Sequence, residues 1–141
     1  MMDIADTDLA PDPWFRALVV DDNPAFRALL CRQLARIGAT VRDAGDASVF
    51  LSALHLTERP FDLAVIDIGL PGLQGDKIIS WLRSSDDAHL RGLPIIVVSG
   101  GDTAGTEFAA AAPRVLFLQK PFRQERLVAA VNQLLRGGLA H

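Results

Sequence analysis

The chain has 141 residues, half of them apolar and 6% aromatic, and a net charge of −3. This length and composition indicate one domain that can bury a hydrophobic core without disulfide or metal cross-links. The charge balance disfavours direct nucleic-acid binding, and the longest apolar stretches are about half the length that spans a bilayer.

The amino-terminal segment 1–13 differs in composition from the rest of the chain. It contains four Asp and no Lys or Arg, and it lacks the basic start and apolar centre of a signal peptide. We expect a disordered acidic leader over 1–13, a domain over 14–136 and a short tail over 137–141. The single cysteine, Cys31, is interpreted as a small apolar residue of a helix, and it fits a cytoplasmic location.

The first strand and helix follow this leader. Residues 16–21 predict a strand, after which Asp22 or Asn23 caps a helix with Pro24 in its first turn. Gly38 ends that helix. Its apolar positions repeat at helical spacing: Phe26, Leu29, Leu30, Leu34 and Ile37.

The middle of the chain repeats this alternation. A short strand over 39–42 precedes a helix capped by Asp46, and the strand over 61–67 is apolar almost throughout, as expected for a strand covered on both faces. A helix over about 75–84 follows the loop LPGLQG, and a polar segment leads from it to the next strand. The apolar side chains of these two helices are Val49, Phe50, Leu51, Leu54, Ile78, Ile79 and Leu82.

The last third predicts two more strand–helix units. Strands over 95–98 and 115–118 precede an Ala-rich helix over about 103–112 and a final helix over about 123–136. Five strands in strict alternation with helices indicate an α/β fold: a doubly wound five-stranded parallel sheet in three α/β/α layers, with right-handed crossovers.

Polar residues stand where these apolar runs stop. Asp21 and Asp22 follow the first strand, Asp67 ends the third, and Ser99 and Lys120 follow the last two. The carboxyl ends of parallel strands meet at one edge of the sheet, which is where such sheets bind ligands. Three carboxylates, one hydroxyl and one ammonium at that edge suit a divalent metal ion and a phosphoryl group.

Each of these residues also has a plain structural interpretation. The Asp pair before Asn-Pro can be a turn and cap, Ser99 a helix cap, and Lys120 a surface residue before a proline. Asp67 is harder to explain in this way, because a carboxylate buried without a partner costs stability.

The segments DDNP, DIGLPGLQG, VVSG and FLQKPF carry these residues in the order of the motifs of response-regulator receiver domains. From about Arg16 to Arg136 the chain resembles that family of two-component and phosphorelay signalling. The resemblance implies a flavodoxin-like sheet with strand order 2-1-3-4-5. It also implies transfer of a phosphoryl group from a phosphohistidine of a sensor histidine kinase or histidine phosphotransfer protein.

The resemblance implies a role for each residue of the site. Asp67 is the phosphoacceptor, and Lys120 and Ser99 contact the phosphoryl oxygens. Ser99 and Phe117 form the switch, and a cis peptide bond precedes Pro121. The implied ligands of Mg²⁺, or Mn²⁺, are Asp21, Asp22, Asp67 and the backbone carbonyl of Gly69.

The output implied by the resemblance is protein–protein signalling rather than turnover of a substrate. A downstream protein target, or a homodimer through the fourth helix, fifth strand and fifth helix, would read the switch, with no direct contact to nucleic acid or membrane. Gly69 and Gly101 offer no side chain to guide a hydrolytic water, which predicts a long-lived acyl phosphate. The three histidines are interpreted as surface or packing residues: His55, His89 and His141.

Three other functions remain open at this point. A haloacid-dehalogenase-like phosphatase also uses an Asp nucleophile, but it needs a second Asp where this chain has Gly69. A flavodoxin-like binding module would need a phosphate-binding first loop, and DDNP would repel phosphate unless a metal intervened. A non-phosphorylated pseudo-receiver is disfavoured because Asp22, Asp67, Ser99 and Lys120 are all present.

Overall fold

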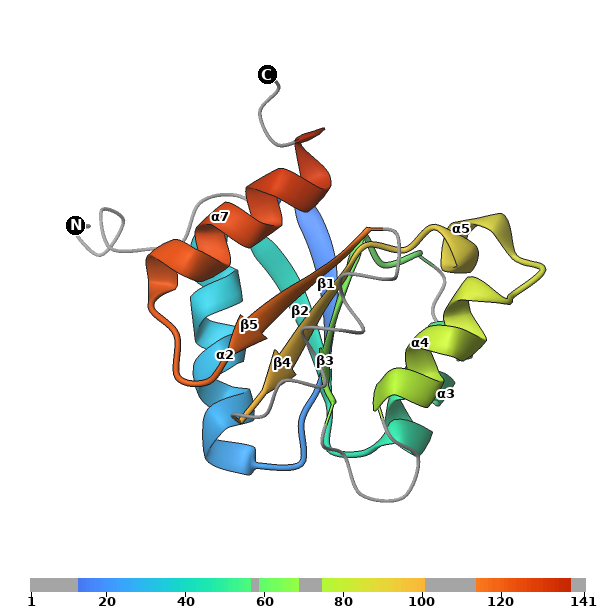
Figure 1. Cartoon of the computed structure of the whole chain (residues 1–141), viewed down its shortest axis with the longest axis horizontal. Helices are drawn as coiled ribbons and strands as arrows, with labels where there is room; N and C mark the ends of the chain where they lie inside the picture. The colour runs from blue at the N-terminus through green and yellow to red at the C-terminus, as the bar shows by residue number, and fades with distance from the viewer. Residues whose placement is uncertain (1–12, 57–58, 69–74, 101–113, 138–141) are drawn as a thin grey trace, which may run out of the picture.

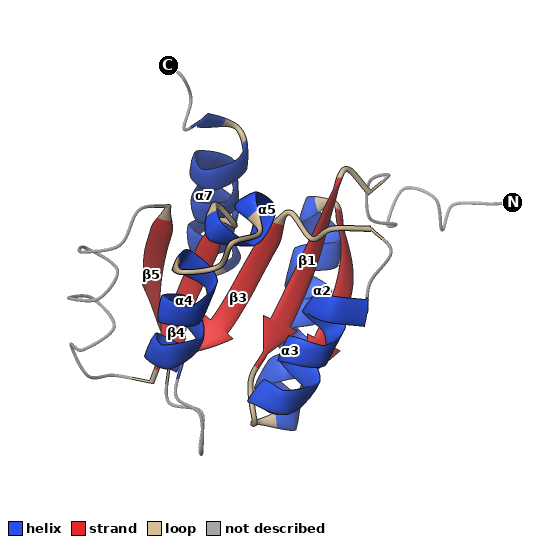
Figure 2. Ribbon diagram, turned by 90° about the vertical axis from the view of Figure 1, so that its right-hand side faces the viewer, coloured by secondary structure: helices blue, strands red, loops and turns tan. Residues whose placement is uncertain are grey.

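The computed structural model describes residues 13–56, 59–68, 75–100 and 114–137. Five strands of the described chain form one parallel sheet in the order β2-β1-β3-β4-β5, and their arrows run the same way in Figure 2. The predicted fold class and strand order are confirmed. The strands are β1 (Phe15–Val20), β2 (Ala39–Ala44), β3 (Leu63–Asp67), β4 (Ile95–Ser99) and β5 (Val115–Gln119).

Helices cover both faces of this sheet. Helices α2 (Pro24–Ile37) and α7 (Gln124–Leu135) lie on one face, and α3 (Ala47–Leu56) and α4 (Gly75–Arg83) lie on the other (Figure 1). The short helix α5 (Ala88–Arg91) precedes β4. The result is the expected arrangement of three layers.

The hydrophobic core is divided by the sheet into two clusters. In β1, Leu18 and Val20 pack toward α3 and α4, whereas Ala17 and Val19 pack toward α2 and α7. Successive side chains of a strand point to opposite faces, so both faces of this strand are buried. The apolar runs of the sequence are continuous for this reason.

The start of α2 follows its sequence signals. The Asn23 side chain accepts a hydrogen bond from the Phe26 N–H at 3.0 Å, and Pro24 occupies the first turn. Gly38 ends the helix with a φ of 119°, a left-handed conformation that glycine adopts without steric cost. The cap fixes the entry of α2 directly after Asp21 and Asp22.

Several sequence expectations differ from the structure. Leu29 and Val49 are 41% and 50% exposed, because each lies on the solvent side of its helix. The second strand continues to Ala44, where it remains paired with β1. The segment expected to be only polar contains α5, whose first turn is capped by the Asp87 carboxylate.

Other sequence predictions concern residues near the ends of the described ranges or outside them. Phe15 is buried at the start of β1, and Trp14, directly before it, is exposed and donates from Nε1 to the Ile37 carbonyl at 3.1 Å. Residues 1–12 of the predicted leader, the helix over 103–112 and the end of the tail lie outside the described residues. Among the helices described, none has the length and apolar content needed to cross a membrane.

The two histidines of the described chain are exposed and contact neighbouring residues. The His55 ring meets Trp81 edge to face, with 5.7 Å between ring centres. His89 Nε2 lies 2.6 Å from the Phe61 carbonyl oxygen. His141 lies outside the described residues.

Candidate functional site

Four of the predicted site residues meet at the carboxyl edge of the sheet. Carboxylate oxygens of Asp21, Asp22 and Asp67 lie within 4.8 Å of one another. The Lys120 Nζ atom lies 2.9 Å from Asp21 Oδ2 and 3.6 Å from Asp67 Oδ2. Residues up to 99 positions apart in the sequence therefore form one cluster, because β1, β3 and β5 all end at this edge.

The cluster is partly removed from solvent. Asp21 is 1% exposed and Asp67 is 7% exposed, whereas Asp22 is exposed. Burying a carboxylate is costly unless a cation or hydrogen-bond donor faces it. Lys120 supplies that cation for both buried carboxylates, and Asp22 leaves the site open on one side.

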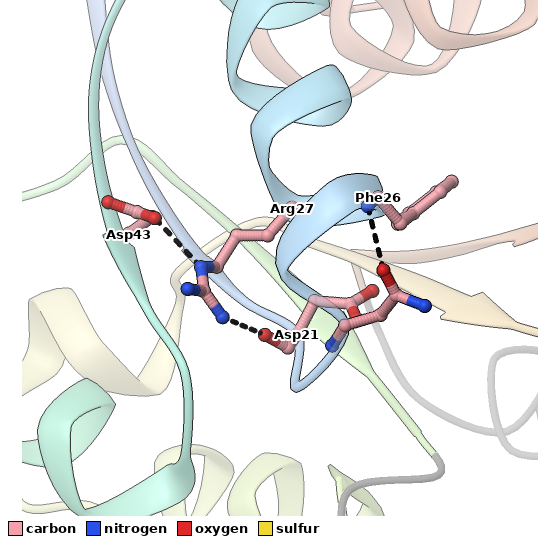
Figure 3. Close-up of polar contacts among 5 residues, drawn as sticks. Asp21, Phe26, Arg27 and Asp43 are labelled. Carbon is pink, nitrogen blue, oxygen red and sulfur yellow. Dashed lines mark hydrogen bonds and ion pairs between the residues drawn. The ribbon is translucent and has the colours of Figure 1, made fainter.

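The loop between β1 and α2 holds Asp21 by further contacts. Its Oδ1 accepts the Asn23 N–H at 2.9 Å, and its backbone carbonyl accepts a hydrogen bond from Arg27 Nη1 at 2.7 Å. Arg27 Nε also donates to Asp43 Oδ2 at 2.9 Å, which connects the loop to the edge strand β2 (Figure 3). The sequence did not lead us to expect that Arg27 contacts the site loop. The only sequence signal for this contact was the position of Arg27 one helical turn after Asn23.

Lys120 is held by its backbone as well as by its side chain. Its N–H donates to the Ser99 carbonyl at 2.7 Å, and the peptide bond to Pro121 is cis, as the resemblance led us to expect. The ammonium group also lies 4.2 Å from the centre of the Phe26 ring. Phe26 was expected only as a core residue of α2, so its contact with the site is a second finding that the sequence did not supply.

The two residues expected to form a switch lie on neighbouring strands. Ser99 is buried at the end of β4, one residue beyond the pairing of Asp67 with Val98. Phe117 lies in β5, is partly buried and packs against the core cluster beneath α3 and α4. Gly69 and Gly101 lie outside the described residues.

This donor set fits a hard divalent cation. Mg²⁺ prefers oxygen ligands and is bound through one or two carboxylates while it keeps several waters. Three carboxylates with oxygens within 4.8 Å of one another provide such ligands, and the exposed Asp22 leaves an approach for water. The adjacent ammonium can pair with an anion brought to the same place.

Comparison with known proteins identifies relatives of this chain. Residues 17–132 match the family model described as the response regulator receiver domain. The response regulator MprA of Mycobacterium ulcerans (strain Agy99) is 38% identical over 122 residues, which cover 86% of this chain and 50% of that protein. MprA of Mycobacterium avium (strain 104) is 37% identical over 86% of this chain and 51% of its own length. The chain thus spans about half the length of these curated relatives.

Solved structures of similar fold include further response regulators. A putative response regulator from Chloroflexus aurantiacus J-10-fl has a TM-score of 0.77 and 27% identity, with coverage of 89% of this chain and 99% of that one. A response regulator receiver protein from Pseudomonas putida has a TM-score of 0.73 and 31% identity, with the same coverage. The chemotaxis response regulator CheY4 of Vibrio cholerae, at 22% identity and a TM-score of 0.73, shares the fold over 86% of this chain and 98% of its own.

Proposed function

Because the chain belongs to the family of response regulator receiver domains, we propose that it accepts a phosphoryl group on Asp67. Receivers of this family serve two-component signalling, and they generally act as phosphoacceptors rather than as turnover enzymes. The donor in this proposal is a phosphohistidine of a sensor histidine kinase or histidine phosphotransfer protein. One observation carries the assignment: the buried Asp67 carboxylate lies within 4.8 Å of two other carboxylates and 3.6 Å from the Lys120 ammonium.

Asp67 is the nucleophile in this proposal. One of its carboxylate oxygens forms a bond to phosphorus as the bond from phosphorus to the donor nitrogen breaks, and the donor imidazole leaves with the bonding electrons. The backbone of β3 holds Asp67 at the end of a fully buried strand. A rigid strand end limits the positions open to the attacking oxygen, which favours a reactive approach.

Asp21, Asp22 and Asp67 are the residues that would hold Mg²⁺ or Mn²⁺, together with the Gly69 carbonyl implied by the family. Such an ion, when bound, supplies positive charge that neutralises the phosphoryl oxygens during transfer. Asp21 also holds the loop through its contacts with Asn23 and Arg27, so its carboxylate is fixed before any ligand arrives.

Lys120 and Ser99 recognise the transferred group in this proposal. The ammonium pairs with one phosphoryl oxygen, and the Ser99 hydroxyl donates to another. Movement of Ser99 toward the phosphoryl group, with a turn of Phe117 on the neighbouring strand, passes the signal to β5 and α7. A downstream protein, or a second copy of the chain, reads that surface.

Binding of beryllofluoride, a stable mimic of the phosphoryl group, tests the assignment. We expect ¹⁹F NMR to detect a bound species with wild-type protein in Mg²⁺, and to detect none with Asp67→Ala. Asp86→Asn, which removes an exposed carboxylate outside the site, is the control and should bind as wild type does. Equal binding by wild type and Asp67→Ala would contradict the assignment, as would no binding by wild type.

The phosphatase alternative makes a different prediction. A haloacid-dehalogenase-like enzyme would hydrolyse a generic phosphate ester with many turnovers, whereas a receiver can accept a new phosphoryl group only after its acyl phosphate has slowly hydrolysed. Release of p-nitrophenol from p-nitrophenyl phosphate, measured against the Asp67→Ala variant, separates the two. We expect no more than one equivalent of product per protein molecule within the lifetime of the acyl phosphate.

A further inference from the structure

Phe26 lies beside the ammonium group of Lys120, in the first turn of α2. The distance from Lys120 Nζ to the ring centre is 4.2 Å, within the range of about 6 Å over which a cation is attracted to a ring face. The Phe26 ring is partly buried and meets the Phe122 ring edge to face, with 5.8 Å between ring centres. The two rings form an aromatic wall, defined here as Phe26 and Phe122, next to the ammonium group.

The wall acts on a side chain whose backbone is already fixed. The Lys120 N–H donates to the Ser99 carbonyl at 2.7 Å, so the strand end does not move freely. The four-carbon side chain beyond it has many rotamers, and ordering it costs conformational entropy. A ring in contact with the ammonium restricts these rotamers without using any of its three N–H donors.

The carboxylates alone would hold the Lys120 ammonium nearer to Asp21 than to Asp67, the proposed phosphoacceptor. The ammonium is closer to Asp21, at 2.9 Å, than to Asp67, at 3.6 Å. When Asp67 is phosphorylated, as proposed above, the ammonium has to turn at least one N–H donor toward the new phosphoryl oxygens. Attraction to a ring face is less directional than a hydrogen bond, so it persists while the N–H donors turn toward another oxygen.

We propose that Phe26 is a positioning residue for phosphoryl transfer, and that its ring keeps the Lys120 ammonium at the site while that group changes anionic partners. The inference rests on the proposed function, because it assigns Phe26 an effect on the reaction of Asp67. Phe26 acts through Lys120 and does not itself contact the phosphoryl group. Phe122 packs against the Phe26 ring with the two ring planes nearly perpendicular.

The rate of phosphorylation by acetyl phosphate in Mg²⁺ tests this role, since a small donor makes no use of a kinase docking surface. Phe26→Leu and Phe26→Met remove the ring and keep an apolar side chain suited to a helix. Two such variants are used so that the test still holds if one of them fails to fold. Phe26→Tyr keeps the ring face. The control Trp81→Leu removes an exposed aromatic side chain of α4, away from the site.

We expect Phe26→Leu and Phe26→Met to lower the rate of phosphorylation by about 3- to 30-fold. This is the change in rate that corresponds to losing the free energy of one cation–ring attraction. Phe26→Tyr should stay within about twofold of wild type, and Trp81→Leu should not differ from it. The NMR signals of the Lys120 side-chain CH₂ next to Nζ provide a second readout. The ring current should shift them upfield in wild type and Phe26→Tyr, and the shift should vanish in Phe26→Leu.

Two results would overturn the role of the ring while leaving the proposed function intact. One is a wild-type rate in folded Phe26→Leu and Phe26→Met. The other is an equal loss in Phe26→Tyr and Phe26→Leu, which would point to packing alone. Absence of any Asp67 adduct in wild type would overturn the proposed function, and this inference with it.

Discussion

Arg27 connects the carboxylate site to the edge of the sheet. Its guanidinium donates to the Asp21 carbonyl and to the Asp43 carboxylate, and its side chain is 23% exposed while that of Asp43 is 50% exposed. A charge-assisted hydrogen bond to a part-buried carbonyl stabilises more than a solvent-exposed ion pair does. The contact with Asp21 should therefore matter more than the contact with Asp43.

Substitution of Arg27 tests this ranking. We expect Arg27→Ala to lower the free energy of unfolding by about 1–2 kcal/mol and Asp43→Asn to lower it by less than about 1 kcal/mol. Urea denaturation followed by circular dichroism measures both. Because Arg27→Ala removes both contacts, a loss in Asp43→Asn as large as that in Arg27→Ala would show that the link to β2, rather than to the site loop, is the stabilising contact.

Cys31 provides a prediction about pH. The pKa of its thiol is raised from 9.0 to about 11, mainly by burial and in smaller part by the negative charge of Asp43, while the positive charge of Arg27 opposes both. The thiolate is the reactive form, so a rise of about two pKa units leaves about 100-fold less of it at pH 8. Alkylation by iodoacetamide should be slow at pH 8 and should still accelerate between pH 9 and 10.

The unfolded protein is the control for Cys31. In concentrated denaturant the thiol is solvated, and its alkylation rate should level off as pH passes its ordinary pKa near 9. A folded protein whose rate levels off at that same pH would contradict the effect of burial.

The sequence revealed some residues of the site and not others, for a physical reason. Asp21, Asp22, Asp67 and Lys120 each end an apolar run, and parallel strands place such ends together. Phe26 and Arg27 lie within a helix, where apolar periodicity predicts which face is buried but not which distant group is contacted. The contact of Phe26 with Lys120 joins α2 to the end of β5, and no local pattern encodes it.

Helix α2 illustrates how local signals determine an element. Asn23 accepts the Phe26 N–H, Pro24 occupies the first turn and Gly38 ends the helix in a left-handed conformation. The two ends of α2 could be predicted from the sequence because helix caps act over only three or four residues. The exposure of Leu29 could not be predicted from the sequence, since it depends on where the sheet and the other helices lie.

The cap of α2 can be tested by substitution. We expect Asn23→Ala to lower the free energy of unfolding by about 1 kcal/mol, because the Phe26 N–H loses its acceptor. Asn23→Ser keeps an acceptor and should cost less than half as much. Thermal melting of the two variants makes the comparison, and equal losses would show that the side-chain cap is not what stabilises this end.

At the scale of the whole fold, the parallel sheet and its three layers were predictable from the alternation of strands and helices. The strand order came from the family resemblance, and short elements such as α5 were not predicted. Alternation of buried strands with amphipathic helices leaves few topologies for a chain of this length. A helix of four residues such as α5 has too few positions to show a period, and its only signal was the capping Asp87.

The proposed metal site would link the stability of the domain to the concentration of divalent metal ions. Three nearby carboxylates repel one another, and an ion that binds only the folded state stabilises it by about 1.4 kcal/mol at ten times its dissociation constant. We expect Mg²⁺ to raise the melting temperature of wild type by several degrees. Asp22→Asn should lose that rise and, in EDTA, should melt no lower than wild type.

Controls separate metal binding from ionic strength. Sodium chloride at matched ionic strength should raise the melting temperature much less, and Asp86→Asn should respond to Mg²⁺ as wild type does. A full Mg²⁺ response in Asp22→Asn would place the metal elsewhere.

The chemical identity of the phosphorylated residue tests the central claim most directly. After incubation with acetyl phosphate and Mg²⁺, borohydride reduces an aspartyl phosphate to homoserine, which peptide mass spectrometry locates in the sequence. The proposed function predicts homoserine at position 67 in wild type, and no labelled residue in Asp67→Asn. Homoserine at another aspartate, or none in wild type, would contradict it.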